Sequence, residues 1–430
     1  MLDIRLVREK PDFVRERLAT RGGGDEAKID EVLRVDAERR KMETALQQLN
    51  ADRKRLSKEI GGKKSRSEPT DELEQRVRQI GDQIADLNSR TAAAETVQTN
   101  LLLQIANLPH ESVPIGKDPS ANRIVRSWGE KPRLTEPVDH VALGTTLNLF
   151  DLDRAAKLSG SGFICFTGVG AKLERALINF MIDLHTREHG YTEISPPFLV
   201  RRDCMIGTSQ LPKFEADMYG LEENQHFLAP TAEVQLTNLH REEILSVADL
   251  PKKFAAYTPC FRREAGAAGR ETRGIIRVHQ FDKVELVKIT TPEKSYEELE
   301  SLTANAERVL QLLGLHYRVV ELCTGDLGFA SAKSYDIEVW SPGSRDGGTY
   351  LEVSSCSNCE DFQARRMQLR FKDRDGKNRF CHTLNGSGVA LPRLFAALIE
   401  NYQQPDGSVR IPEKLQPYFG AEKMGVTKHE

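Results

Sequence analysis

Two segments in the middle of the chain carry the residue types that a nucleotide site needs. The first reads Phe-Arg-Arg-Glu over residues 261–264. After a glycine-rich stretch over 265–274, the second reads Arg-Val-His-Gln-Phe-Asp-Lys-Val-Glu over 277–285. Arginines can contact phosphate oxygens, an aromatic ring can support a base, and a carboxylate can accept from an exocyclic amino group. We therefore predict that a strand, a cationic loop and a returning strand hold a nucleotide, although Phe-Arg-x-Glu alone also fits an ordinary salt-bridged hairpin.

Two more segments make this pattern part of an ordered set. Residues 190–199, Gly-Tyr-Thr-Glu-Ile-Ser-Pro-Pro-Phe-Leu, lie upstream, and residues 386–393, Gly-Ser-Gly-Val-Ala-Leu-Pro-Arg, lie downstream, where we predict a helix. The three segments resemble motifs 1, 2 and 3 of the class II aminoacyl-tRNA synthetases. The chain resembles the seryl-tRNA synthetases of bacterial type in particular, over essentially all of its length, through Pro-Thr-Ala-Glu at 230–233, the loop at 265–274, Leu-Cys-Thr-Gly-Asp-Leu-Gly at 322–328, Glu-Val-Ser-Ser at 352–355 and His-Thr-Leu-Asn-Gly-Ser-Gly at 382–388.

The resemblance implies an ATP-dependent ligase that uses Mg²⁺ and no zinc. Such an enzyme activates L-serine to seryl-adenylate with release of pyrophosphate and then transfers serine to the 3′-terminal adenosine of serine tRNA. We expect selenocysteine tRNA to be a second acceptor, and the class implies a homodimer with Pro197 at its interface. Two other functions share this fold: a ligase that charges a carrier protein, and a non-catalytic paralogue acting as an interaction protein, which should have lost Arg262, Glu285 or Arg393.

The resemblance also implies roles for single residues. Arg262 is expected to bind the α-phosphate, Glu264 to face the adenine amino group, and Arg393 to cover the base; these three form the catalytic set. The set implied for serine, holding its ammonium and its hydroxyl, is Thr231, Ala232, Glu233, Arg262, Glu285, Asn385 and Ser387. The set implied for ATP is Arg262, Arg263, Glu264, Arg273, Phe281, Glu352, Val353, Ser354, Ser355 and Arg393, of which Glu352 and Ser355 would coordinate Mg²⁺.

The expected chemistry suits these residue types. Attack of the serine carboxylate on the α-phosphorus brings two anions together, and arginine plus a metal ion can offset that repulsion without a general base. A pocket that hydrogen-bonds the serine hydroxyl should reject alanine by about 10⁴ to 10⁵. A small pocket should exclude the extra methyl group of threonine.

Cysteine and histidine patterns offer other sites. Cys356 and Cys359, with Cys381 and His382 beyond them, could be metal ligands, but the spacing is poor and the neighbouring strand has an expected role in ATP binding. The stretch 185–189 matches H-x-x-E-H but lacks an evident further ligand. Seven cysteines, an odd number without a secretory signal, predict reduced thiols and a cytoplasmic protein.

The elements that must position the chemical residues begin with a long N-terminal hairpin. Between residues 28 and 108 the apolar side chains repeat every seven residues in a narrow stripe, which is typical of a two-stranded coiled coil. The repeat is interrupted over 61–69, Gly-Gly-Lys-Lys-Ser-Arg-Ser-Glu-Pro, where the glycine pair and the proline can end one helix and permit reversal. We predict an antiparallel hairpin with arms of about 30 to 40 residues.

The far end of this hairpin is basic, in a chain of formal net charge -3. Clustered lysine and arginine gain from counterion release on a nucleic-acid backbone. Because no aromatic residue lies among them, a structured RNA read by shape is favoured over stacked single-stranded bases. A dimerisation or spacer coiled coil would explain the heptads alone. We predict that tRNA contacts Arg53, Lys54, Arg55, Lys58, Lys63, Lys64 and Arg66.

The remainder of the chain predicts an α+β fold. Several strand-like runs follow one another without an intervening helix, which favours an antiparallel sheet flanked by helices, as in class II synthetases, over a doubly wound fold. Helical runs are expected over 172–189 and 293–313. The strand-like runs cover residues 162–167, 254–257, 284–287, 317–322 and 335–340.

We divide the chain into an arm that binds tRNA (1–108), a linker rich in proline and glycine (109–131) and a catalytic domain (132–430). The charged content of 29% fits a protein with a long solvated element. No apolar run approaches 18 residues, so we expect no membrane segment.

Overall fold

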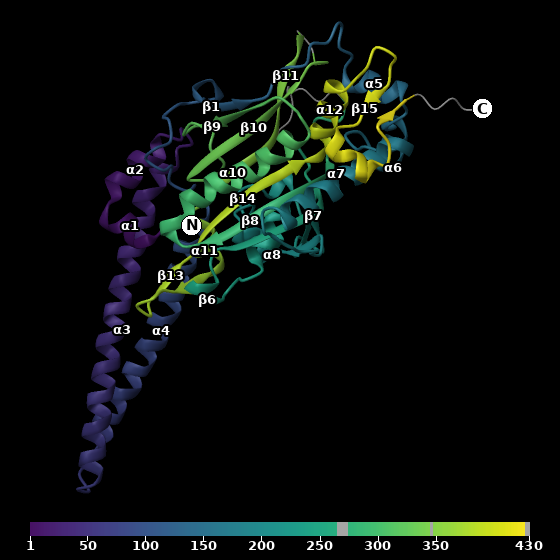
Figure 1. Cartoon of the computed structure of the whole chain (residues 1–430). Coiled ribbons are helices and arrows are strands. Elements are labelled where there is room, and N and C mark those ends of the chain that lie inside the picture. The colour runs from purple at the N-terminus through teal and green to yellow at the C-terminus, as the bar shows by residue number, and fades with distance from the viewer. Residues whose placement is uncertain (265–273, 345–346, 426–430) are drawn as a thin grey trace. The chain divides into compact units, whose positions relative to one another are not determined.

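The computed structural model describes residues 1–264, 274–344 and 347–425 of the chain. Internal contacts divide the chain into two compact units: Met1–Ala19 with Gly23–Ala106, and Thr20–Gly22 with Asn107–Glu430. The first is helical and the second combines a sheet with helices (Figure 1). Within the described residues no helix is both long and apolar enough to cross a membrane.

A helical hairpin forms most of the first unit. Two long helices, α3 (Ile29–Lys64) and α4 (Asp71–Leu103), run side by side and are joined by a short turn (Figure 1). Their contact is apolar, with Leu56, Ile80 and Ile84 buried between them, and this confirms the coiled-coil hairpin. The unit also contains α1 (Ile4–Glu9), α2 (Pro11–Ala19) and the 3₁₀ turn η1 (Asp25–Lys28).

The end of α3 differs from the prediction. Gly61 and Gly62 lie inside the helix, which continues to Lys64, and the N–H of Ser65 donates to the Gly61 carbonyl oxygen at 3.2 Å. Glycine lowers helix stability by about 1 kcal/mol but keeps its backbone donor, so a packed hairpin can hold it in helical conformation. Pro69, which has no such donor, lies in the turn between the helices.

An eight-stranded sheet is the centre of the second unit, and it is antiparallel except for the β2–β7 pair. This confirms the predicted α+β class. In spatial order its strands are β1 (Arg123–Trp128), β9 (Tyr317–Glu321), β10 (Lys333–Ser341), β11 (Thr349–Asn358), β14 (His382–Ala390), β8 (Gln280–Thr290), β7 (Lys252–Phe261) and β2 (Thr192–Glu193).

The helices α7 (Gly168–Arg187), α10 (Ser295–Leu312) and α12 (Leu391–Asn401) pack against this sheet and share the main apolar core with it. The other helices are α5 (His140–Thr146), α6 (Leu152–Ser159), α8 (Arg202–Gly207), α9 (Glu233–Asn238), α11 (Phe362–Met367) and α13 (Gln416–Phe419), with 3₁₀ turns η2 (Pro119–Ala121), η3 (Glu215–Asp217), η4 (Val247–Asp249), η5 (Pro292–Lys294) and η7 (Glu413–Leu415). Small sheets are formed by β3 (Leu199–Arg201), β5 (His226–Leu228) and β4 (Tyr219–Leu221), by β13 (Asn378–Phe380), β12 (Arg370–Lys372) and β6 (Ile244–Ser246), and by β15 (Val409–Arg410) with β16 (Lys423–Met424).

One segment of this unit was predicted wrongly, and a second contains a strand that was not predicted. Residues 162–167 were expected to be a strand but contribute only an isolated bridge between Phe150 and Phe166. Gly162 has φ of +82° and lies so close to His279 that a Cβ atom would be 2.6 Å from the imidazole ring, and the run begins in a turn at Ser161 and Gly162 instead of a strand. The expected linker 109–131 contains β1; its residues are mostly exposed, so no alternating apolar pattern marks the strand.

The segment 386–393 is also not the helix that we predicted. Strand β14 continues to Ala390, and α12 begins only at Leu391. Pro392 therefore lies in the first turn of the helix, where the missing N–H costs no intrahelical hydrogen bond. Arg393 follows it and projects from the same turn.

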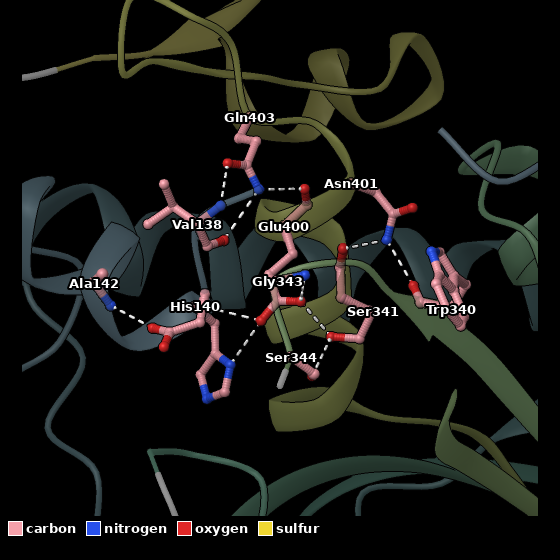
Figure 2. Close-up of polar contacts among 12 residues, drawn as sticks. Val138, His140, Ala142, Trp340, Ser341, Gly343, Ser344, Glu400, Asn401 and Gln403 are labelled. Atoms are coloured by element: carbon pink, nitrogen blue, oxygen red, sulfur yellow. Dashed lines mark hydrogen bonds and ion pairs between the residues drawn. The ribbon is translucent and has the colours of Figure 1, made fainter. Parts of the chain in front are cut away.

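A buried carboxylate fixes the other end of α12 (Figure 2). Glu400 accepts from the backbone N–H and the Nδ1–H of His140 at 2.9 and 2.8 Å, from the Gly343 N–H at 2.9 Å and from the Ser341 hydroxyl. A buried carboxylate with several donors resists displacement, because losing them would leave a charge unpaired. These bonds hold α12 against the end of β10, and the helix presents Arg393 from that fixed position.

Candidate active site

A cavity of about 370 Å³ opens on the face of the sheet opposite α7, α10 and α12. Strand β8 supplies Phe281, Lys283 and Glu285 to it, while Val284 and Leu286 point into the core shared with the helices. Of the residues predicted for catalysis, ATP, serine and metal, those that line the cavity are Thr231, Glu233, Arg262, Glu264, Phe281, Glu285, Glu352, Val353, Ser354, Ser355, Asn385, Ser387 and Arg393.

A β-bulge in β11 brings Glu352 and Ser355 into this cavity together. In a regular strand, residues three apart face opposite sides of the sheet. Here the register against β10 shifts so that Val353 has no partner. The extra residue reverses the alternation, and both oxygen-bearing side chains line the same hollow.

Two arginines from distant segments reach the cavity. Arg262 follows the end of β7; its guanidinium lies 5.2 Å from the centroid of the Phe281 ring, and its Nε donates to the Pro230 carbonyl oxygen at 3.4 Å. Arg393 donates to the Glu352 carbonyl oxygen at 2.8 Å and lies 3.5 Å from the carboxylate of the same residue. Two guanidinium groups therefore line the cavity, and each can bind the phosphate oxygens of an anion within it.

The cavity is polar and buried around Glu233. The carboxylate of this residue accepts from Asn385 Nδ2 at 3.0 Å. Nearby, Lys283 Nζ lies 2.5 Å from the Glu285 carboxylate and donates to the Thr231 hydroxyl at 2.8 Å. Carboxylates, a hydroxyl and an amide in one buried pocket can bind a small molecule that carries both an ammonium and a hydroxyl.

The sequence matches two family models, one over the helical arm and one over much of the sheet unit. Residues 1–109 match the seryl-tRNA synthetase N-terminal domain, and residues 214–402 match the tRNA synthetase class II core domain (G, H, P, S and T). Serine–tRNA ligases of Akkermansia muciniphila and Carboxydothermus hydrogenoformans are 59% and 54% identical to the chain, over 98% and 99% of its length and 98% and 99% of their own. The chain belongs to the seryl-tRNA synthetase family.

Solved structures of the family agree with this membership. The seryl-tRNA synthetase of Pyrococcus horikoshii, complexed with ATP, has a TM-score of 0.93 and 39% identity over 100% of both chains. The cytoplasmic serine–tRNA ligase of Naegleria fowleri, in complex with AMP, has a TM-score of 0.88 and 32% identity over 100% of this chain and 99% of its own. The predicted family, fold class, enzyme class and serine–tRNA ligase function are confirmed, and the carrier-protein ligase and the non-catalytic paralogue are not favoured.

Some predicted site residues do not line the cavity. Ala232 is buried in a second apolar cluster. Arg263 is exposed, because it neighbours Arg262 in an extended segment where successive side chains point to opposite sides. Arg273 lies outside the described residues.

Other lining residues were missed by the sequence analysis. Lys283 lies two residues from both Phe281 and Glu285, so the period of two in a strand was a sufficient signal for it. Arg277 forms an ion pair with Glu264 at 2.5 Å. The two residues are 13 apart in the sequence, so the pairing follows only from how the chain folds back and no local pattern predicted it. The remaining lining residues that were not predicted are Ile276, Val278, Ala390 and Pro392.

The cysteines and histidines of the two alternative patterns are buried or hydrogen-bonded within the fold. Cys356, Cys359 and Cys381 are buried free thiols, and His382 Nδ1 lies 2.9 Å from the Ser295 hydroxyl. His185 is buried and its Nε2 donates to the Gly388 carbonyl oxygen at 2.8 Å, which supports the bulged part of β14. Burial lowers the pKa of His185 to about 3, so this imidazole stays neutral.

The predicted tRNA-binding residues lie at the distal end of α3 and in the turn after it. All are exposed except Lys63, which is half-buried. Arg55, Lys63, Lys64 and Arg66 pair with carboxylates of the same hairpin. Among the described residues, the remaining three, Arg53, Lys54 and Lys58, have no acidic partner within salt-bridge distance.

The pH dependence of serine binding should follow Glu233. Burial, and next the neighbouring Glu285 carboxylate, raise the pKa of Glu233 from 4.5 to about 7. We expect ionised Glu233 to accept hydrogen bonds from serine, and protonation removes its negative charge and weakens those bonds. We therefore expect the KM for serine to rise as the pH falls below about 7, by at most about tenfold for each pH unit. The measurement is serine-dependent pyrophosphate exchange from pH 6 to 8.5. The Glu233→Gln variant should have a higher KM without this slope; a wild-type KM that is constant over the range would contradict the assignment.

Proposed function

We propose that the cavity activates L-serine with ATP and that the resulting seryl-adenylate acylates the 3′-terminal adenosine of serine tRNA. The observation that carries this proposal is the convergence of Arg262, Glu285, Glu352 and Arg393, from four separate segments, on one cavity. ATP binding is further supported by the ATP and AMP complexes of the two solved relatives.

In the first step, the residues of the cavity bind and align two anions. Phe281 lies beneath the adenine, Glu264 accepts from its amino group and Arg393 covers it. Arg262 contacts the α-phosphate and the serine carboxylate together, which lowers their repulsion and holds the attacking oxygen in line with the leaving pyrophosphate. No residue needs to take a proton, since the serine carboxylate is already ionised.

The cavity fits a magnesium ion held largely by the nucleotide. Glu352 and Ser355 offer a carboxylate and a hydroxyl oxygen in the same cavity, which suit this hard cation. Over residues 1–264, 274–344 and 347–425, no three acidic, histidine or cysteine side chains form a metal-binding group. Phosphate oxygens and water would complete the ligand set, and the bound ion would neutralise phosphate charge.

The second step needs room for the end of a tRNA beside the activated serine. A second cavity of about 530 Å³ is bounded by Phe214 and Met218 and shares five lining residues with the first: Thr231, Glu233, Arg262, Glu264 and Arg277. We assign it to the terminal adenosine, whose 3′-hydroxyl then attacks the carbonyl carbon of the adenylate. An aromatic wall suits a base, which can stack on it.

The proposal includes the partners and the place of action. Residues 1–108 act as the arm that binds tRNA, and selenocysteine tRNA is a second acceptor. The protein acts as a homodimer in which Pro197 contacts the other subunit; Pro197 is exposed beside the exposed apolar side chains Phe198 and Leu199. A cytoplasmic location is supported by seven free cysteines.

Charging of a tRNA pool with each amino acid in turn tests this function, together with serine-dependent pyrophosphate exchange. Serine alone should be transferred. Exchange should fall roughly 10²- to 10³-fold in kcat/KM for Arg262→Ala, because the guanidinium stabilises charge at the reacting centre. Arg263, the exposed neighbour of Arg262, provides the matched control. The Arg263→Ala variant should retain more than a tenth of the exchange activity. Efficient transfer of another amino acid would refute the proposal, and full exchange by Arg262→Ala would remove this arginine from its role.

A further inference from the structure

Lys283 is a charged residue of the cavity that has no part in the steps above. Lys283 is 5% exposed, and its ammonium contacts both the Glu285 carboxylate, at 2.5 Å, and the Thr231 hydroxyl, at 2.8 Å. A buried lysine costs desolvation energy that such contacts must offset. Its position in a substrate cavity therefore calls for a role beyond packing.

The position of Lys283 along β8 indicates which part of the bound substrates its side chain faces. Phe281, Lys283 and Glu285 share the cavity face, and alternate residues of a strand are about 6.8 Å apart. Under the proposed function, the first of these supports adenine and the last binds serine. Lys283 lies between them, at the level of the bond that forms between serine and the α-phosphate.

The contacts that Lys283 makes are the ones that serine requires. The proposed site binds serine through Glu285 and Thr231, yet the lysine ammonium now contacts both. The substrate ammonium or hydroxyl must compete for these oxygens. A displaced lysine ammonium inside a buried pocket needs another anion, and the α-phosphate is the anion that the substrates bring to its level.

We propose that serine displaces the Lys283 ammonium from Glu285 and Thr231 onto an α-phosphoryl oxygen of ATP, so that amino acid binding completes the charge-stabilising site. This inference rests on the proposed function. A serine carboxylate oxygen forms a bond to the α-phosphorus, the bond from phosphorus to the oxygen that bridges to the β-phosphate breaks, and pyrophosphate leaves with that electron pair. Lys283 stays protonated and stabilises the charge on the α-phosphoryl oxygens.

Mutual binding of the two substrates tests the displacement. The affinity of α,β-methylene-ATP, which cannot react, is measured with magnesium, with and without saturating serine. The wild-type protein should bind the analogue about tenfold more tightly with serine, a coupling of ordinary size between sites. In Lys283→Met the ratio should fall to about one or below, because no ammonium is left to move to the phosphate.

Two further variants separate this role from a structural one. Lys288 is a second buried lysine on β8, paired with Glu298 at 2.7 Å and outside the cavity, so Lys288→Met should lose stability but keep the coupling. Lys283→Arg retains the charge and should keep part of the coupling, and it remains informative if Lys283→Met does not fold. The proposal is overturned if serine and the analogue bind the wild-type protein independently, or if Lys283→Met keeps the full ratio. Absence of binding by either ligand would instead refute the proposed function.

Discussion

Alanine is expected to be activated about 10⁴ to 10⁵ times less efficiently than serine in pyrophosphate exchange. The amino acid end of the cavity is built from polar groups, among them buried Thr231 and Ser387 and half-buried Glu233. Serine gives its hydroxyl a partner among them, whereas alanine leaves a buried acceptor or donor unsatisfied, which costs far more than the lost contact area. The measurement is the ratio of kcat/KM for the two amino acids under identical conditions.

A pair of serine variants in the same cavity distinguishes this explanation from a general effect on catalysis. Ser387→Ala removes a hydroxyl from the amino acid end and should narrow the ratio between serine and alanine. Ser355→Ala removes one from the bulged strand at the nucleotide end and should slow both substrates equally, leaving the ratio unchanged. A wild-type ratio of only about 10 to 200, as apolar pockets achieve, would contradict a hydroxyl-binding pocket.

Features that depend on local periodicity were predictable from the sequence. The heptads located the hairpin, and the contact of Leu56 with Ile80 and Ile84 follows from their seam positions. Alternation along β8 likewise puts Phe281 and Glu285 on one face of a strand, although we took their roles from the family resemblance and not from this period. In both cases the residues that determine the geometry are neighbours in the chain.

Features set by pairing between distant segments were not predictable. The bulge at Val353 exists only in relation to β10, and without it Glu352 and Ser355 would face opposite sides of the sheet. Residues 386–390 form the end of a strand rather than a helix because β14 pairs with β8 as far as its last residue, Ala390, and the helix begins only at Leu391. The Glu400 network depends on donors some 60 and 260 residues away, so no local pattern marks it.

The arm shows a related limit of local reasoning. Gly61 and Gly62 are helix-breaking by propensity, yet tertiary packing of the hairpin continues the helix through them. The consequence is that Lys63 and Lys64 stand on the last turn of α3 and not in a loop. Their spacing from Lys58 is therefore set by helical geometry, which gives the basic residues a fixed pattern for a phosphate backbone.

Removing the arm is expected to separate the two steps of the reaction. The hydrogen bond between the Asp25 carboxylate and the Ala106 N–H, at 2.9 Å, brings the two ends of the hairpin together, so residues 28–104 can be replaced by a short glycine link that leaves Asn107 in place. All residues of the serine and ATP cavity belong to the second compact unit. Serine-dependent pyrophosphate exchange should stay within about twofold, whereas kcat/KM for tRNA charging should fall about 10³-fold, because the lost phosphate contacts dominate nucleic-acid affinity. Equal loss of both activities would mean that the arm supports the catalytic fold.

Point variants of the arm test whether charge is the reason. Neutralising Lys54 and Lys58 to glutamine should lower the slope of log affinity for tRNA against log salt by about 1 for each residue. Arg34 and Arg90 are exposed arginines of the same hairpin that pair with carboxylates, and their replacement by glutamine should change the slope little. An affinity that does not respond to salt would deny the distal end a phosphate partner. Lys54 and Lys58 have no acidic partner among the described residues, and the exposed ion pairs of Arg34 and Arg90 contribute little to stability. Both sets should therefore melt near the wild-type temperature, so any difference in slope reports on RNA binding and not on folding.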